Sequence, residues 1–175
     1  MNKIFSQKFI LCFLMVVSGY SVAKNNDSIA LGLFNEPEGD RAGAEIVATL
    51  KSDYFGGKLG GVLYSSKRHN SNGNEESEIY GGLSAFAFVH FGQKINPYLG
   101  VGVFIGQGVG CDDSNSYYDD DDNCKNRNEV ALYPELGVEI PIEKVTISPY
   151  IRRYFDSSTS NKSGNVYGVT VGISF

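Results

Sequence analysis

Histidine is scarce in this sequence, basic residues are outnumbered by acidic ones, and long apolar runs are missing. The chain has two histidines and three cysteines in 175 residues, which leaves few ligands for a metal site built on imidazole and thiolate. Its longest apolar run, residues 9–17, is much shorter than the roughly 18 residues that a membrane-spanning helix requires. No long helical pattern with caps occurs either, so a protein built on helices is not expected.

The first 23 residues have the pattern of a secretory leader. Lys3 and Lys8 precede the apolar run, and Ser21 and Ala23 place small residues where a signal peptidase cleaves. We therefore expect residues 1–23 to be a cleaved signal peptide and residues 24–175 to form the mature domain. That domain carries 13 basic and 20 acidic residues, a net charge of −7. Without a basic face, nucleic acid is not an expected partner.

The remainder of the chain predicts strands. It is rich in glycine, tyrosine and phenylalanine, and segments of alternating apolar and small or polar residues recur between turn clusters. There are eight such segments, at residues 28–34, 42–51, 58–66, 78–91, 97–107, 129–140, 144–154 and 166–175. The connections between them alternate in length. Residues 52–57, 92–96 and 141–143 are short turns, whereas residues 35–41, 67–77, 108–128 and 155–165 are longer and polar.

The two faces of these strands differ in a way that separates a membrane barrel from a soluble one. In the strand at 129–140 the apolar residues Val130, Leu132 and Leu136 alternate with Glu135 and Glu139. A soluble barrel turns the apolar face inward, and a membrane barrel turns it outward. Glycines share the polar face in the strands at 97–107 and 166–175, and small residues suit the inside of a narrow barrel. The strand at 78–91 departs from this pattern, because Phe86 and Phe88 share a face with Ser84 and His90, which predicts a bulge or a partly aromatic interior.

The C-terminal strand carries the most specific pattern. Large apolar side chains alternate there with small or polar ones, and the large ones are Tyr167, Val169, Val171, Ile173 and Phe175. A terminal strand that ends on an aromatic residue, behind a secretory leader, resembles that of the small bacterial outer-membrane barrels of the OmpA and OmpX type. The resemblance implies an all-β fold, an eight-stranded antiparallel up-and-down transmembrane β-barrel. It also implies an integral outer-membrane location, and that the barrel-assembly machinery recognises this strand.

A barrel of this kind would enclose several charged residues, which are Glu45, Lys51, Glu135, Glu139 and Arg152. Buried charges persist when they are paired, so we expect an ion-pair network that fills the lumen. Eight strands enclose a space that side chains can fill, which argues against a general porin. A proton or ion path is the alternative for these residues.

Cys111 and Cys124 are the cysteines that remain after processing, and they flank an acidic loop. In an oxidising compartment this pair predicts a disulfide, which would stabilise by roughly 3 kcal/mol in the chain-entropy model. A thiolate metal site is not expected. The run Asp119–Asp122 lacks the glycine and closing glutamate of an EF-hand loop, so it predicts a solvated loop, with a weak divalent-cation site as the alternative.

Enzymes on this fold include lipid A deacylases and palmitoyltransferases, which would require a histidine near a serine and an acid at the outer rim. His69 lies in an outer loop, and His90 lies near the periplasmic end of its strand, the wrong side for outer-leaflet lipid A. The region 152–157 does not have the local pattern of the deacylases. No catalytic residue, cofactor or metal is therefore predicted, and a lipid A-modifying enzyme is one alternative. A soluble lipocalin-like barrel is the other.

Basic residues lie at the outer ends of strands, where lipopolysaccharide presents phosphates. They are Arg41, Lys67, Arg68 and Arg153, and guanidinium groups pair well with phosphate. Ordinary snorkelling at the membrane interface is the alternative explanation. The predicted function is a non-enzymatic surface protein whose outer loops contact lipopolysaccharide, another envelope protein or a host surface.

Overall fold

The computed structural model describes residues 27–37, 41–69, 75–92, 95–111, 124–156 and 164–175. Every regular element in these ranges is a strand. The strands are β1 (Ser28–Asn35), β2 (Arg41–Lys51), β3 (Phe55–His69), β4 (Glu75–His90), β5 (Asn96–Cys111), β6 (Cys124–Ile142), β7 (Val145–Arg153), β8 (Phe155–Asp156) and β9 (Asn165–Ser174). No helix in these ranges is long and apolar enough to cross a membrane.

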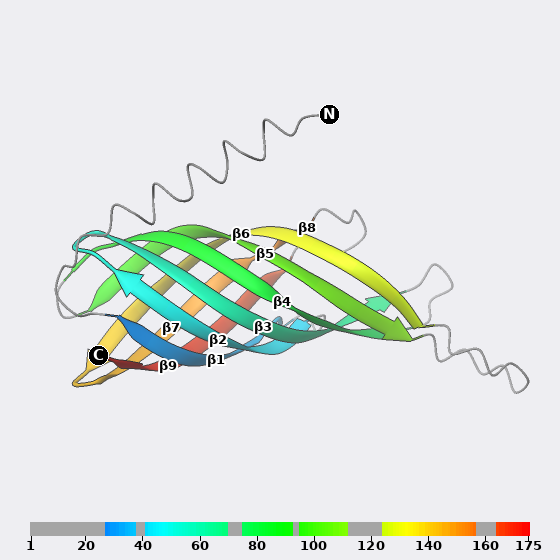
Figure 1. The fold of residues 1–175 in the computed structure, drawn as a ribbon, viewed down its shortest axis with the longest axis horizontal. Coiled ribbons are helices and arrows are strands. Elements are labelled where there is room, and N and C mark those ends of the chain that lie inside the picture. Colours follow the sequence, from blue (N-terminus) through cyan, green and yellow to red (C-terminus); the bar gives the residue numbers. More distant parts are fainter. Residues whose placement is uncertain (1–26, 38–40, 70–74, 93–94, 112–123, 157–163) are drawn as a thin grey trace, which may run out of the picture.

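The strands form a closed barrel, shown in Figure 1. From β1 to β7 consecutive strands pair antiparallel, β7 also pairs with β9, and β9 returns to pair with β1. β8 continues β7 in the same register against β6, so the two occupy one of eight positions around the barrel. The interruptions of the β6–β7 ladder fall beside Pro134 and Pro149, because proline has no N–H to donate. The predicted eight-stranded antiparallel up-and-down barrel is confirmed.

Most aliphatic side chains of the strands point outward. Leu33, Leu83, Val101, Leu132 and Ile173 are between 63% and 73% exposed, and they come from five strands around the barrel. The interior holds the polar and charged face instead, including Glu45, Glu135, Glu139 and Arg152. An apolar exterior around a polar interior is the arrangement of a membrane-spanning barrel and the reverse of a soluble one.

Aromatic side chains share the interior with glycines. Phe86 and Phe88 point inward and are 5% and 4% exposed, and the register of β4 is continuous against both neighbours. The interior of this strand is therefore partly aromatic, without the bulge that was the alternative expectation. Gly102 shows why glycine faces the aromatics: a Cβ added there would collide with the Tyr133 ring.

The two ends of the barrel differ. At one end, here called the terminal end, Ser28 pairs with Ser174, and the turn between β6 and β7 has two residues. At the other, the distal end, β3–β4 and β5–β6 form tall hairpins (Figure 1). The expected loops at 67–77 and 108–128 are thus partly wrong. β3 extends to His69 and β4 already begins at Glu75. Likewise, β5 extends to Cys111 and β6 already begins at Cys124. Both hairpins are longer than expected because cross-strand pairing continues through polar sequence.

The charged and aromatic interior

The centre of the barrel is held by Arg152 between two glutamates. Its Nη2 lies 2.6 Å from Glu135 Oε2, and its Nη1 lies 3.2 Å from Glu45 Oε2. Nε donates a further hydrogen bond of 2.7 Å to Glu135, and Nη1 donates one of 2.8 Å to the Tyr154 hydroxyl. Alternation along β2, β6 and β7 turns all three charged residues inward, where they are 1–4% exposed. Arg152 thus compensates two buried carboxylates that would otherwise be strongly unfavourable.

Two lysines extend this network toward the terminal end. Lys58 Nζ lies 3.0 Å from Glu135 Oε1, which also accepts a hydrogen bond of 2.9 Å from the Tyr98 hydroxyl. Lys51 Nζ lies 2.6 Å from Glu139 Oε2. The five charged residues predicted for the lumen therefore all lie inside and are paired there.

Lys58 was missed by the sequence analysis. In β3 apolar residues occupy both alternating faces, since Leu59 and Leu63 share one and Val62 and Tyr64 share the other. Alternation therefore gave no orientation for Lys58. Glycines gave no orientation either, because Gly56 and Gly60 share its face whereas Gly57 and Gly61 lie on the other, so β3 held no signal that could have placed Lys58 inside.

A second cationic contact lies toward the distal end and corrects a prediction. Arg41 was expected at the outer rim, yet its side chain is 7% exposed inside the barrel. Its guanidinium lies 3.8 Å from Glu129 and packs 5.2 Å from the Tyr154 ring centre. The prediction was wrong because β2 begins at Arg41, one residue earlier than expected, and alternation then gives it the inward orientation of Glu45. Farther toward the distal end, the half-buried Arg127 pairs with the buried Glu78 at 3.2 Å.

Aromatic rings fill the space around these ion pairs. This aromatic cluster consists of Phe34, Tyr64, Tyr80, Phe86, Phe88, Tyr98, Phe104, Tyr133, Tyr150 and Tyr154. Tyr64 stacks on Tyr80 with ring centres 5.0 Å apart, and Phe86 stacks on Tyr133 at 5.9 Å. The tyrosine hydroxyls are used as donors to the buried carboxylates, as Tyr64 to Glu129 and Tyr150 to Glu45 show. Rings and ion pairs together close the middle of the barrel.

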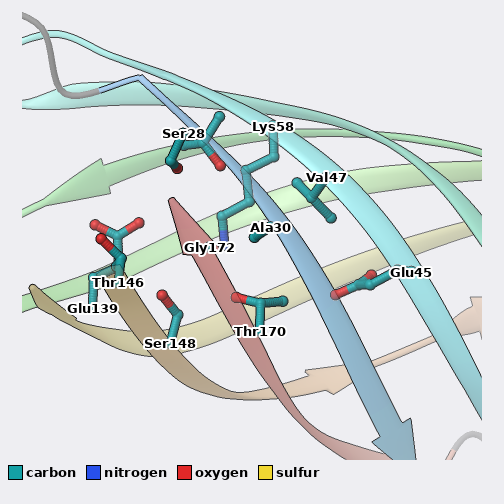
Figure 2. A pocket seen from close by; sticks show the side chains of 11 residues that line it. Ser28, Ala30, Glu45, Val47, Lys58, Glu139, Thr146, Ser148, Thr170 and Gly172 are labelled. Carbon is teal, nitrogen blue, oxygen red and sulfur yellow. The ribbon is translucent and has the colours of Figure 1, made fainter. Parts of the chain in front are cut away.

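The terminal part of the interior is different, because short hydroxyl side chains line a cavity there. They are Ser28, Thr49, Thr146, Ser148 and Thr170, and we call this space the hydroxyl cavity. Its volume is about 20 Å³, room for about one water molecule. Lys58, Glu45 and Glu139 also reach it, and Figure 2 shows these charged side chains pointing into the space from β3, β2 and β6. The cavity is polar enough to hold water but too small for an organic ligand.

Of the two histidines weighed for catalysis, the structure describes the side chain of one. His90 lies inside the barrel near the terminal end, and its Nε2 lies 2.8 Å from the Ser52 carbonyl oxygen. Within the described ranges no three His, Cys, Asp or Glu side chains are placed to hold a metal ion. The side chain of His69 and residue Ser157 lie outside the described part of the chain.

The other predicted positions fall into two groups. Lys67 and Arg153 are exposed on the outside of the barrel, and the Arg153 guanidinium lies 5.8 Å from the Phe155 ring centre. Tyr167, Val169, Val171, Ile173 and Phe175 also point outward. The side chains of Arg68, Cys111 and Cys124, the loop 112–123 and the leader at 1–23 lie outside the described part, although the backbones of Cys111 and Cys124 are directly paired.

The sequence matches no protein-family model and no curated protein sequence. Solved structures do resemble it. Neisserial surface protein A superposes with a TM-score of 0.58 at 14% identity, over 86% of this chain and 95% of that one. The attachment invasion locus protein Ail of Yersinia pestis superposes with a TM-score of 0.55 at 12% identity, over 87% of this chain and 100% of that one. A major outer membrane protein from Thermus thermophilus superposes with a TM-score of 0.55 at 13% identity, over 87% of this chain and 100% of that one. The closed barrel, its apolar exterior and these likenesses agree: the chain has the fold of the small eight-stranded bacterial outer-membrane β-barrels.

Proposed function

We propose that this chain is an integral outer-membrane protein whose role is contact at the cell surface, without enzymatic activity and without an open pore. The observation that carries the proposal is that Arg152, its two glutamates and the aromatic cluster fill the middle of the lumen. The hairpin at the distal end is also long, since β5 has 16 residues and β6 has 19. About 9–11 residues of strand suffice to cross a bilayer. The surplus in the β5–β6 hairpin therefore projects beyond the membrane at the distal end, where it is free to meet a partner.

The orientation follows from the rule that outer-membrane barrels have short periplasmic turns and longer outer loops. The terminal end then faces the periplasm, and the distal hairpins face outward. An epitope tag inserted between residues 116 and 117 should be detected on intact cells, and the folded protein should shift in gel mobility on boiling. A tag inserted in the turn at Glu143–Lys144 is the matched control and should require permeabilised cells. Detection of only the control tag on intact cells would reverse the orientation, and a soluble periplasmic protein would refute the proposal.

The partner at the outer loops is not expected to be a polyanion. Ail, which shares the fold, has been crystallised with the heparin analogue sucrose octasulfate. Here the loop at 112–123 contains six aspartates, and the mature domain is acidic overall. The acidic loop would repel a negatively charged surface, so a host or envelope partner at this hairpin is expected to present neutral or basic groups.

Lipopolysaccharide is a second proposed contact, at the outside of the distal end. Lys67 and Arg153 are exposed there, Arg68 lies at the same end of β3, and basic groups pair with lipid phosphates. Replacing these three residues with Gln should lower stabilisation by lipopolysaccharide and leave stability in neutral detergent nearly unchanged. Arg41→Gln is the contrasting variant, because Arg41 is buried and its loss should lower stability in both. Equal lipopolysaccharide effects on the wild type and the triple variant would leave snorkelling as the explanation.

The last strand is proposed as the segment that the assembly machinery recognises. Val171, Ile173 and Phe175 are 50–64% exposed on the outside, and the Phe175 amide pairs with the Asp27 carbonyl at 3.0 Å to close the barrel. Phe175→Asp should reduce the yield of folded protein in the outer membrane. Phe91→Asp is a matched control, because Phe91 is 60% exposed at the same end but lies in a turn. Equal yields for the two variants would argue against a special role of the final residue.

A further inference from the structure

The ammonium group of Lys58 lies among three aromatic rings. Its Nζ is 4.0 Å from the ring centre of Tyr98, 5.1 Å from that of Phe86 and 5.5 Å from that of Phe88. On its remaining side it contacts Glu135 Oε1 at 3.0 Å. Aromatic faces carry partial negative charge and attract cations within about 6 Å. Several rings with one carboxylate form the kind of site that proteins use to bind ammonium ligands.

The site does not depend on Lys58 for its construction. The two oxygens of Glu135 have different partners, since Oε2 accepts from Arg152 at 2.7 Å and Oε1 accepts from Tyr98 at 2.9 Å as well as from Lys58. Without the lysine, Arg152 would still compensate the carboxylate, and the Tyr98 ring would still be held by its hydroxyl. Phe86 is fixed independently by its stacking on Tyr133.

The site also borders a polar cavity that has room for water. Lys58 lines the hydroxyl cavity, and Figure 2 shows its side chain extending from β3 into that space. Its side chain retains 12% of its surface exposed, compared with 1% for Glu135. A small ligand that takes the path of the lysine side chain would therefore pass through a polar region before it reaches the rings.

We propose that Phe86, Phe88, Tyr98 and Glu135 form an ammonium-binding cage that opens toward the hydroxyl cavity and is filled by the protein's own Lys58. Small primary alkylammonium ions are the ligand class that this cage accepts once the lysine side chain is removed. The inference does not depend on the proposed role at the cell surface, because it concerns the interior of the barrel alone.

The test is chemical rescue of Lys58→Ala in detergent micelles, with n-propylammonium as the probe because it replaces the atoms that the substitution removes. The variant should unfold at lower temperature than the wild type, and the probe should raise its unfolding midpoint in a saturable manner. The midpoint of the wild type should not move, and neutral 1-propanol should not rescue the variant. If the variant does not fold, its refolding yield with and without the probe gives the same comparison.

Two further variants separate the cage from simple ion pairing. Lys51→Ala also removes a lysine side chain that is paired with a buried carboxylate, but among the described residues Lys51 contacts no aromatic ring. The probe should stabilise it much less than Lys58→Ala. Adding Phe86→Leu to Lys58→Ala should weaken the probe about tenfold, the factor expected for one desolvated ring contact. The proposal is overturned if the probe fails to stabilise Lys58→Ala, if Lys51→Ala responds equally, or if the loss of Phe86 has no effect.

Discussion

The aromatic cluster and the hydroxyl cavity are two parts of one barrel interior that the same strand alternation fills in different ways. The rings come mainly from β3, β4, β5 and β6, where glycines on neighbouring strands make room for them. The hydroxyl side chains come mainly from β1, β2, β7 and β9, where short residues leave space. Arg152, Glu45, Glu135 and Lys58 lie where the two parts meet.

This difference assigns separate roles to the two parts. The aromatic cluster with its ion pairs excludes water, so it should carry most of the stability that the interior provides and should block passage. The hydroxyl cavity is a place where water can solvate polar groups, so it should tolerate changes in charge and volume. Matched substitutions in the two parts test this division, beginning with the largest expected effect.

Removal of a central charge should be far more harmful than removal of a charge beside the cavity. Arg152→Met removes a cation that contacts two buried carboxylates, Glu45 and Glu135, and we expect the free energy of unfolding to fall by about 3–5 kcal/mol. Lys51→Met should lower it by about 1–2 kcal/mol, because it leaves a single carboxylate, Glu139, which lines the hydroxyl cavity where water can solvate it. Urea titrations in micelles, followed by gel mobility, measure both. Equal losses would contradict the difference between the two parts.

The next largest difference is expected when a methyl group is added in the aromatic cluster or beside the hydroxyl cavity. Gly102→Ala places a methyl group against the Tyr133 ring and the densely packed cluster, so a loss of about 1–3 kcal/mol is expected. Ser148→Thr adds a methyl group beside the hydroxyl cavity, where there is space for part of it, so its effect on stability should be smaller than that of Gly102→Ala. The same urea titration applies. A harmful Ser148→Thr would mean that the cavity is as tightly packed as the cluster.

The smallest effect on barrel stability is expected from changes in the β5–β6 hairpin, which lies outside both the aromatic cluster and the hydroxyl cavity. The backbones of Cys111 and Cys124 are directly opposite in the β5–β6 ladder, a spacing of about 4.5–5.5 Å that suits a disulfide. We expect protein purified under oxidising conditions to lack free thiols. Reduction should loosen the hairpin, seen as faster proteolysis there, while the boiling-dependent gel shift is retained. Free thiols in the oxidised protein, or unfolding of the barrel on reduction, would each be inconsistent with this expectation.

Alternation in the sequence predicted the strands, and glycines on the polar faces predicted which face turns inward. Together they placed Glu135, Glu139 and Arg152 inside, because β6 and β7 separate apolar and polar residues cleanly. It could not orient Lys58, since β3 is apolar on both faces. Arg41 was misplaced because the last residue of a loop and the first residue of a strand look alike when pairing is unknown.

The composition of the interior was harder to predict than its outline. Aromatic residues are expected outside a membrane barrel, so Phe86 and Phe88 disturbed the pattern of β4. The glycines that accommodate them lie on other strands, as Gly100 does opposite Phe88. Such complementarity depends on register between strands, which alternation within one strand does not contain.

The central claim is that outward aliphatic side chains contact lipid all around the barrel, while ion pairs, hydroxyl groups and aromatic rings fill the interior. The most direct test is the accessibility of spin labels attached to single cysteines at outward positions on different strands, in a background with Cys111 and Cys124 replaced by Ser. Suitable positions are Leu33, Leu83, Val101, Leu132 and Val171, which are 50–73% exposed. In lipid vesicles all five labels should collide more often with oxygen, which concentrates in the bilayer, than with a water-soluble nickel complex. Preferential collision with the nickel complex around the barrel would contradict the account.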